Sequence, residues 1–339
     1  MNGQLELTTA PSVSITSFTQ DDLANGRVVY VHDSSETLTD SFDFEISDAT
    51  STLAIDSFAI AITPVNDAPL GTDNTLTTLE DTDYVFSAAD FGFTDFNDTP
   101  ANNLSAVVIT TLPINGTLFL NVGATMPGAV TAGQVISLAD IDNLVFSPAL
   151  HQNGMGYDAF TFQVQDDGGI ANAGVDTDTA ANIITFDVTP VNDAPAGADK
   201  TVTTLEDTAY QFVVADFGFS DVSDSPASSL ENVIITSVPA SGALVLTGGP
   251  NAGVVGLSQV INVSEIQYLT FIPDADGNGT GYASFDFQVQ DDDGILNGGA
   301  DTDASANRIT IDVTSVNDAP AGTDNTVTTL EDTPYTFSA

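Results

Sequence analysis

Residues 160–167 read Phe-Thr-Phe-Gln-Val-Gln-Asp-Asp, and this stretch decides the fold. Its apolar residues alternate with polar ones, so an extended chain would present one apolar and one polar face. The run ends in two aspartates, a residue type that favours turns. The stretch therefore predicts a β-strand with one buried face, followed by an acidic loop.

The same alternation recurs elsewhere in the chain. Residues 285–292 read Phe-Asp-Phe-Gln-Val-Gln-Asp-Asp, and residues 42–46 and 184–188 also alternate. Gly, Pro, Asn and Asp separate such runs roughly every 8 to 12 residues, and no segment has a helical period of useful length. We therefore expect an all-β fold made of Ig-like Greek-key β-sandwiches.

Two motifs show that the chain is a tandem repeat. The segment Pro-Val-Asn-Asp-Ala-Pro at 64–69 returns at 190–195 and, with Ser in the first place, at 315–320. The segment Thr-Leu-Glu-Asp-Thr at 78–82 returns with the same offsets, so the repeat is about 125 residues long. We interpret the chain as part of a longer array, with four segments. These are the C-terminal part of a truncated repeat at 1–69, complete repeats at 70–195 and 196–320, and the start of a further repeat at 321–339.

The charge balance excludes several classes of partner. The chain has 339 residues, 48 acidic and 3 basic, with a net charge of −45. Nucleic acids and anionic membranes need a Lys/Arg surface, so neither is expected as a partner. Because 42% of the residues are hydrophobic, including 20 Phe, real cores are possible. There is no Cys, which excludes disulfides and thiolate metal sites, and no apolar run is long enough to insert in a bilayer.

Most acids recur at the same places in the two complete repeats, and these places are loops and linkers. Clustered carboxylates repel one another, and a hard divalent cation relieves that repulsion. Calcium binds six to eight oxygen atoms with tolerant geometry, whereas softer metals prefer the nearly absent His and Cys. We therefore expect calcium as the cofactor. The candidate ligands are Asn66, Asp67, Glu80, Asp81, Asp95, Asp98, Asp166, Asp167, Asp176, Asp178, Asn192, Asp193, Glu206, Asp207, Asp221, Asp224, Asp291, Asp292, Asp301, Asp303, Asn317 and Asp318.

Other polar residues are expected to be ordinary surface. Asp83, Asp142 and Asp158 become Ala209, Gln267 and Ala283 in the next repeat, which is typical of solvated positions. The two histidines, His32 and His151, have no counterpart in another repeat, and we expect no catalytic role for them. The alternative for the whole acidic set is that the loops are merely solvated, as in proteins adapted to saline surroundings.

The linkers and the strands before them resemble a known family. With the Phe-x-Phe-x-Val strand and the Asp-Asp loop, they resemble the cadherin-like tandem repeats of very large secreted bacterial adhesins. The first segment also resembles chondroitin-sulphate-proteoglycan repeats, through residues 18–23 (Phe-Thr-Gln-Asp-Asp-Leu), 28–33 (Val-Val-Tyr-Val-His-Asp) and 40–44 (Asp-Ser-Phe-Asp-Phe).

The resemblance implies calcium between successive domains. At the second linker, it implies Glu80, Asn192, Asp193 and Asp221 as ligands, with Asp166 and Asp167 from a base loop. The family pattern has an acid two places before the linker Asn-Asp; Pro or Ser stands there in this chain.

The predicted function follows from these parts. We expect a non-enzymatic, extracellular segment that acts as a calcium-stiffened spacer in a bacterial cell-surface or biofilm adhesin. Its expected partners are neighbouring repeats of the same chain, and cell-surface proteins or glycans. The alternative is a glycan-binding or spacer module of a large secreted enzyme. No Trp is available as a sugar platform, Tyr84, Tyr210, Tyr157 and Tyr282 are expected in the cores, and only Tyr30 and Tyr268 remain for such a role.

Overall fold

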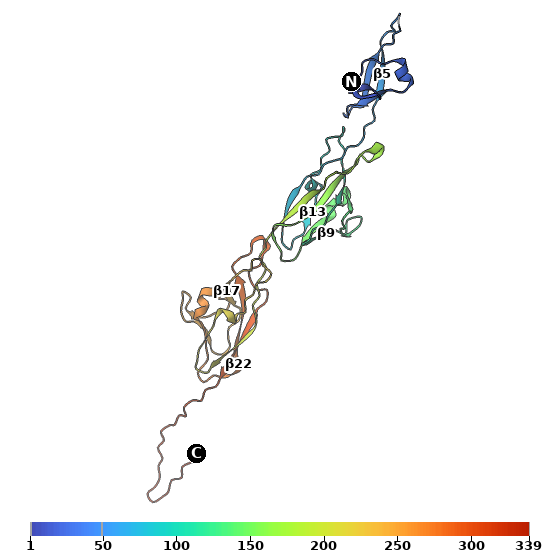
Figure 1. Ribbon diagram of the computed structural model, residues 1–339. Coiled ribbons are helices and arrows are strands. Elements are labelled where there is room, and N and C mark those ends of the chain that lie inside the picture. Colours follow the sequence, from blue (N-terminus) through green and yellow to red (C-terminus); the bar gives the residue numbers. More distant parts are fainter. Residues whose placement is uncertain (1, 49, 339) are drawn as a thin grey trace. The chain divides into compact units, whose positions relative to one another are not determined.

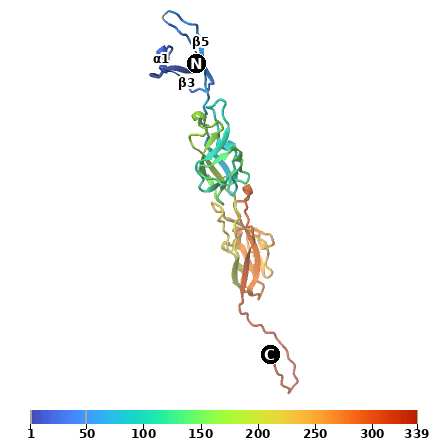
Figure 2. The same ribbon diagram turned by 90° about the vertical axis from the view of Figure 1, so that its right-hand side faces the viewer.

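The computed structural model describes residues 2–48 and 50–338. The chain divides into two compact units, residues 1–190 and 191–339, and each is described by itself. Figure 1 labels the main elements, and Figure 2 shows the same ribbon after a quarter turn. No helix among the described residues is long and apolar enough to cross a lipid bilayer.

The N-terminal part of the first unit consists of two small antiparallel sheets. One has the strand order β2-β1-β3, and the other is the β4-β5 hairpin. Among residues 2–48 and 50–68, Glu6 alone is buried, so this part has no apolar core. The predicted alternation at 42–46 stops early, since β4 ends at Phe44 and Ile46 is exposed. The elements are β1 (Gly3–Leu7), β2 (Ala10–Ser14), α1 (Gln20–Ala24), β3 (Val28–His32), β4 (Thr39–Phe44) and β5 (Asp56–Ala61).

The remainder of the first unit is a sandwich of two sheets. One sheet has the order β11-β8-β13-β14-β6, and the other has the order β10-β9-β12-β7. All pairs are antiparallel except β14 with β6, and the chain crosses repeatedly from one sheet to the other. The elements are β6 (Asn74–Leu79), β7 (Tyr84–Val85), η1 (Ala88–Phe91), β8 (Leu104–Ile109), β9 (Gly116–Leu120), β10 (Gly128–Ala129), β11 (Val135–Ser137), η2 (Leu138–Asn143), β12 (Leu144–Pro148), β13 (Gly154–Asp166), η3 (Ala171–Ala173) and β14 (Asn182–Thr189).

The alternating strand found in the sequence lies at the centre of this sandwich. Phe160, Phe162 and Val164 of β13 are fully buried, and the polar residues between them face outward. Phe186 of β14 packs face to face with Phe146 of β12 in the other sheet, with ring centroids 3.7 Å apart. Aromatic contacts between the two sheets therefore hold the core together.

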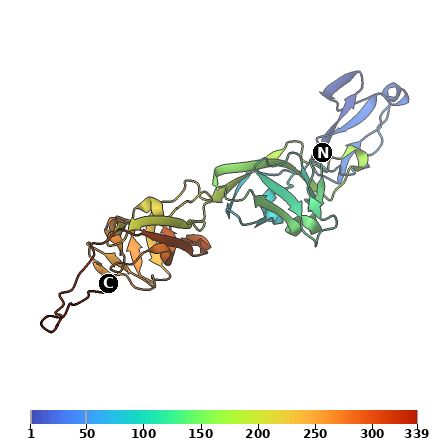
Figure 3. The ribbon, with the colours of Figure 1, turned by 90° about the horizontal axis from the view of Figure 1, so that it is seen from below.

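The second unit repeats this architecture. Its sheets have the orders β15-β23-β22-β17-β20 and β16-β21-β18-β19, and β15 pairs with β23 in parallel. Figure 3 shows the strands of both sandwiches, green in the first unit and yellow to red in the second. The elements are β15 (Lys200–Leu205), β16 (Tyr210–Gln211), η4 (Val214–Asp216), β17 (Leu230–Ile235), β18 (Ala243–Leu246), β19 (Gly253–Val254), β20 (Val260–Asn262), η5 (Val263–Tyr268), β21 (Leu269–Ile272), β22 (Gly279–Asp291), η6 (Leu296–Gly298) and β23 (Asn307–Thr314).

The predicted all-β fold with a sandwich in each complete repeat is confirmed. Phe285, Phe287 and Val289 of β22 are as fully buried as their counterparts in β13. Residues 321–338 repeat the sequence of β6 and β7, but no strand forms in that segment. Phe337 is exposed there, whereas its counterpart Phe86 is buried in the first core.

Candidate metal sites

The first linker is fixed to the sandwich that follows it. Leu70 and Thr94 exchange two backbone hydrogen bonds of 2.8 Å, which bring the linker beside the loop after η1. The Asn66 side-chain amide donates to Asp166 Oδ1 at 3.0 Å, at the end of β13. The linker, the loop after η1 and the end of β13 thus meet at one end of the sandwich, which we call the linker end.

Carboxylates from all three segments gather at the linker end. Asp95 and Asp98 come from the loop after η1, Asp166 comes from β13, and Asp67 comes from the linker. The Asp67 backbone N–H donates to Asp98 Oδ2 at 3.1 Å. Asp95, Asp98 and Asp166 are buried, with 9%, 9% and 3% of their surface exposed. The fold therefore withdraws several like charges from solvent in one place.

One of these buried oxygens lacks a donor. Asp95 Oδ2 accepts a hydrogen bond from the Asn102 backbone N–H at 2.7 Å, whereas Asp95 Oδ1 is shielded and has no hydrogen-bond partner among the described residues. A buried polar atom without a partner costs about 1–3 kcal/mol. A cation at this oxygen would remove that cost, and the oxygen-only donor set suits a hard ion such as calcium.

The electrostatics of the linker end agree with crowded carboxylates. Burial raises the pKa of Asp98, and the neighbouring charges of Asp95, Asp67 and Glu36 raise it further. Burial likewise raises the pKa of Asp166, with a contribution from Asp95. The ionised forms are thus disfavoured in the absence of a nearby positive charge.

Glu36 is a member of this group that sequence reasoning missed. One oxygen each of Glu36, Asp67 and Asp98 lie within 4.8 Å of one another. Glu36 Oε2 is shielded and has no hydrogen-bond partner among the described residues. The residue lies in the loop between β3 and β4, where the alignment of the two complete repeats does not reach.

The second repeat builds the same linker end from equivalent residues. Asn192 donates to Asp291 Oδ1 at 3.0 Å, and the Asp193 backbone N–H donates to Asp224 at 3.1 Å. Asp221 Oδ1 and Asp291 Oδ2 are buried and have no hydrogen-bond partner in the described part of the chain. Burial raises the pKa of Asp224 to about 6, and the charges of Asp221 and Asp193 contribute. The unpartnered oxygen of Asp95 therefore recurs at Asp221.

A second acidic group lies at the opposite end of the second sandwich. Glu206 is buried; its Oε2 accepts from Asn278 at 2.7 Å, and its Oε1 accepts from the Val316 backbone N–H. Oxygens of Asp207, Asp276 and Asp318 lie within 4.8 Å of one another, and all three residues are exposed. The Asp276 charge is the main reason that the pKa of Asp318 is raised, with smaller effects of burial and the other acids.

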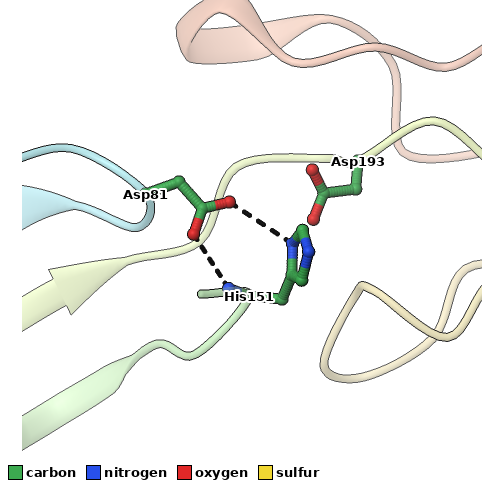
Figure 4. A group of neighbouring side chains, drawn as sticks. All are labelled: Asp81, His151 and Asp193. Carbon is green, nitrogen blue, oxygen red and sulfur yellow. Dashed lines mark hydrogen bonds and ion pairs between the residues drawn. The ribbon is translucent and has the colours of Figure 1, made fainter. Parts of the chain in front are cut away.

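The corresponding end of the first sandwich differs by one residue. His151 stands where the second repeat has Asp276, and this substitution hid Asp276 from a comparison of shared acids. The His151 backbone N–H donates to Asp81 Oδ1 at 2.9 Å, and its ring Nδ1 lies 3.3 Å from Asp81 Oδ2, as Figure 4 shows. His151 is thus tied to Asp81. Glu80 is buried on this side and accepts from Asn153 at 3.0 Å.

The structure moves two predicted ligands to a different linker. The resemblance implied Asp166 and Asp167 as ligands at residues 192–193. Asp166 instead contacts Asn66, and Asp167 Oδ1 accepts from the Asn103 backbone N–H at 2.7 Å. The strand order explains the difference, because β13 ends beside the first linker, whereas Glu80 pairs through its backbone with Thr189 at the other end.

Several predicted ligands hold loops together instead of facing the linker-end group. Asp178 Oδ2 accepts from the Gly71 backbone N–H at 2.9 Å and from Asn182 at 2.8 Å, and Asp303 repeats this arrangement in the second repeat. Asp176 and Asp301 each accept from a glutamine side chain. Asp292 accepts from the Ser229 backbone N–H, and the Asn317 side chain donates to the Asp318 carbonyl.

One residue expected at the surface is buried. Asp158 is 7% exposed, and its carboxylate accepts from the Ile114 and Asn115 backbone N–H groups at 2.7–3.0 Å. The prediction of a solvated Asp158 was wrong, because the residue ties a loop to β13.

The predicted core positions of the paired tyrosines are confirmed, since Tyr84, Tyr157, Tyr210 and Tyr282 pack against the two cores. Tyr268 is 36% exposed, and the Tyr30 hydroxyl donates to Asp40.

Comparison with known proteins supports cadherin-like repeats. Extracellular matrix protein 3 of Lytechinus variegatus is 38% identical over 121 residues, which cover 35% of this chain and 4% of the relative. Human FRAS1-related extracellular matrix protein 2 is 33% identical over 168 residues, or 49% of this chain and 5% of the relative. Mouse chondroitin sulfate proteoglycan 4 is 39% identical over 103 residues, or 25% of this chain and 4% of the relative. The matched part is thus a small fraction of each relative.

A solved structure and a family model complete the comparison. The crystal structure of mouse protocadherin-24 EC1-3 aligns with 93% of this chain and 90% of its own, with a TM-score of 0.48 and 13% identity. The family model supports the cadherin-like resemblance of the first segment. Residues 1–62 match the family described as cadherin-like.

Proposed function

We propose that this chain is a calcium-binding segment of an extracellular repeat array. The observation that carries the proposal is the buried carboxylate oxygen without a hydrogen-bond donor, present at Asp95 and again at the equivalent Asp221. Two repeats with different surrounding sequence keep the same unfavourable arrangement, which a bound cation would make favourable.

The residues at each linker end form the proposed ligand sets. Calcium prefers several carboxylate, amide and carbonyl oxygens, and extracellular modules bind it with a Kd of about 10⁻⁴ to 10⁻³ M. When bound, the ion neutralises the clustered charges. The proposed first set is Asn66, Asp67, Asp95, Asp98 and Asp166, with Glu36; the proposed second set is Asn192, Asp193, Asp221, Asp224 and Asp291.

The mechanism we propose is the fixation of each linker by charge. The linker supplies Asn66 and Asp67, and the following sandwich supplies Asp95, Asp98 and Asp166. Without a cation, repulsion among these carboxylates opposes the seating of the linker on the sandwich. With a cation, ligands from both sides hold the linker in place, so the segment acts as a stiff spacer.

We further propose an extracellular adhesin as the setting of this spacer, with no enzymatic role. Extracellular matrix proteins among the relatives support the location, and the Val-Asn-Asp-Ala-Pro linkers support a bacterial surface or biofilm adhesin. The proposed repeat boundaries remain 70–195 and 196–320, and neighbouring repeats remain the proposed partners. Further proposed ligands at the opposite ends of the sandwiches are Glu80, Asp81, Glu206, Asp207, Asn317 and Asp318.

The proposal predicts that calcium raises the melting temperature of the full chain above that in EDTA, and more than magnesium does. Asp95→Asn together with Asp221→Asn should abolish most of this rise, because both variants replace a ligand charge at a linker end. Asp142→Gln, which removes an exposed carboxylate that is already Gln in the second repeat, is the matched control and should keep the full rise. Scanning calorimetry measures the melting temperature of the natural chain, the double variant and the control in EDTA, in calcium and in magnesium. An equal rise in the double variant and the control would overturn the proposal.

A further inference from the structure

The two linker ends differ in the residue two places after the buried Asp166 and Asp291. The chain at the end of β13 reads Asp166-Asp167-Gly168, whereas the chain at the end of β22 reads Asp291-Asp292-Asp293. The second repeat therefore carries one more carboxylate at this place.

The first repeat leaves no room for that carboxylate. A Cβ atom at Gly168 would lie 1.7 Å from Asn66 Oδ1 and 2.5 Å from Asn102 Nδ2. The Asn102 amide donates to Asn66 Oδ1, so that oxygen already has a partner. Gly168 and Asn102 together close this side of the site with neutral groups.

The second repeat opens the same side. Ser228 replaces Asn102, and its hydroxyl donates to Asp293 Oδ2 at 2.5 Å. Its distance to Asn192 Oδ1 is 3.5 Å, the limit of a hydrogen bond, so Asn192 Oδ1 is less engaged than Asn66 Oδ1. Where the first repeat has a hydrogen bond between the Asn102 and Asn66 side chains, the second repeat has the Asp293 carboxylate bound to the Ser228 hydroxyl.

The backbone of Asp293 and Ser228 contacts both buried acids that have an unpartnered oxygen, as the backbone of Gly168 and Asn102 contacts their counterparts in the first repeat, and the exposed Asp293 side chain is what the second repeat adds. The Asp293 backbone N–H donates to Asp291 Oδ1 at 3.0 Å. Its partner Ser228 donates through the backbone N–H to Asp221 Oδ2 at 2.8 Å. Asp291 Oδ2, in a residue only 1% exposed, has no hydrogen-bond partner among the described residues, whereas Asp166 Oδ2 is 3.3 Å from the Asn66 amide.

We infer that Asp293 is an additional cation-binding carboxylate. It makes the second linker end bind divalent cations more tightly than the same site would with a neutral residue at position 293. The inference rests on the proposed calcium function and adds a residue that sets affinity. An additional carboxylate on the loop that follows Asp291, held by Ser228, increases the attraction of the second linker end for a doubly charged ion, and ligand charge is a main determinant of calcium affinity.

The test uses calcium titration of the full chain by calorimetry, in a background of Asp95→Asn that disables the first site. Adding Asp221→Asn identifies which calcium-binding step in the titration belongs to the second site, since this step, the second-site transition, should disappear. Adding Asp293→Asn, which keeps an oxygen to accept from Ser228, should instead weaken the same transition about tenfold, which corresponds to about 1.4 kcal/mol. Adding Asp142→Gln controls for the loss of one exposed charge and should leave it unchanged.

Two outcomes separate the failure of this inference from the failure of the proposed function. Unchanged affinity for Asp293→Asn, with a second-site transition present, would overturn the inference alone. If Asp221→Asn removes no transition, the proposed function itself fails.

Discussion

At the residue scale, the central feature is a carboxylate oxygen that is buried and unpartnered. Asp95 Oδ1 and Asp221 Oδ1 occupy equivalent positions, and each side chain uses only its second oxygen for a backbone hydrogen bond. An ionised carboxylate is not expected to stay in such a place unless a positive charge compensates it. These two residues therefore indicate an ion more directly than the overall acidity does.

The raised pKa of Asp224 predicts a pH dependence for the metal-free protein. Its pKa is about 6 in the fold, against 3.8 for the ordinary group, so protonation favours the folded state. That contribution is complete below the ordinary pKa and is lost as the pH rises through about 6. In EDTA, the melting temperature should therefore fall between about pH 4 and pH 7. Acids with lowered pKa values, such as Asp167 and Asp286, stay ionised throughout this window.

Two comparisons test the contribution of Asp224 to that dependence. Asp224→Asn should make the pH profile shallower, because its amide has no proton to lose, and the raised pKa values of Asp98 and Asp166 account for part of the remaining slope. Saturating calcium should also flatten it, since the cation competes with the proton. A profile in EDTA that is flat for the natural chain, or equally steep in Asp224→Asn, would show that this carboxyl does not titrate as described.

Some of the proposed ligands could be predicted from the sequence and others could not. Asp95, Asp98, Asp221 and Asp224 recur between repeats, and the structure brings them to the linker ends as a group. Asp276 and Asp293 have no acidic counterpart at the aligned position, and Glu36 lies outside the two complete repeats, so a search for shared acids missed all three. The acids shared by the two repeats also include Asp178, whose carboxylate accepts hydrogen bonds from backbone N–H groups.

At the element scale, alternation predicted the strands well because the sandwich buries one face of each. Residues 160–165 and 285–290 became the central strands β13 and β22. The sequence did not show which end of a strand meets which linker. That depends on strand order, and the parallel pairing of β6 with β14 brings Glu80 to the end opposite Asp166.

The acids that tie elements together predict a variant with a purely structural defect. Asp178→Ala would leave the Gly71 backbone N–H and the Asn182 amide without their acceptor. We expect the free energy of unfolding to fall by about 1–3 kcal/mol in metal-free buffer. Denaturant unfolding measures this change, with Asp83→Ala as a control that matches Ala209 of the second repeat.

The same variant separates structural acids from ligands. Calcium affinity should stay within about twofold of the natural chain, because Asp178 has protein donors for both oxygens. A loss of calcium binding with unchanged stability in EDTA would instead make Asp178 a ligand.

At the scale of the whole molecule, the net charge of −45 consists of acids with different roles. Some hold loops, as Asp158 and Asp178 do, and some are exposed, as Asp83 and Asp142 are. The linker-end acids form a third group. Several of their carboxylates are buried, so water screens their mutual repulsion poorly. We propose that calcium at the linker ends makes this third group a means of fixing linkers in an extracellular array.

The most direct test is a crystal structure of the chain grown with calcium, with the ions located by anomalous scattering. We expect a calcium ion within about 2.3–2.6 Å of Asp95 Oδ1 and another at the same distance from Asp221 Oδ1. If calcium is present at saturating concentration and both oxygens contact only water or protein donors, the account of the linker ends as calcium sites is wrong.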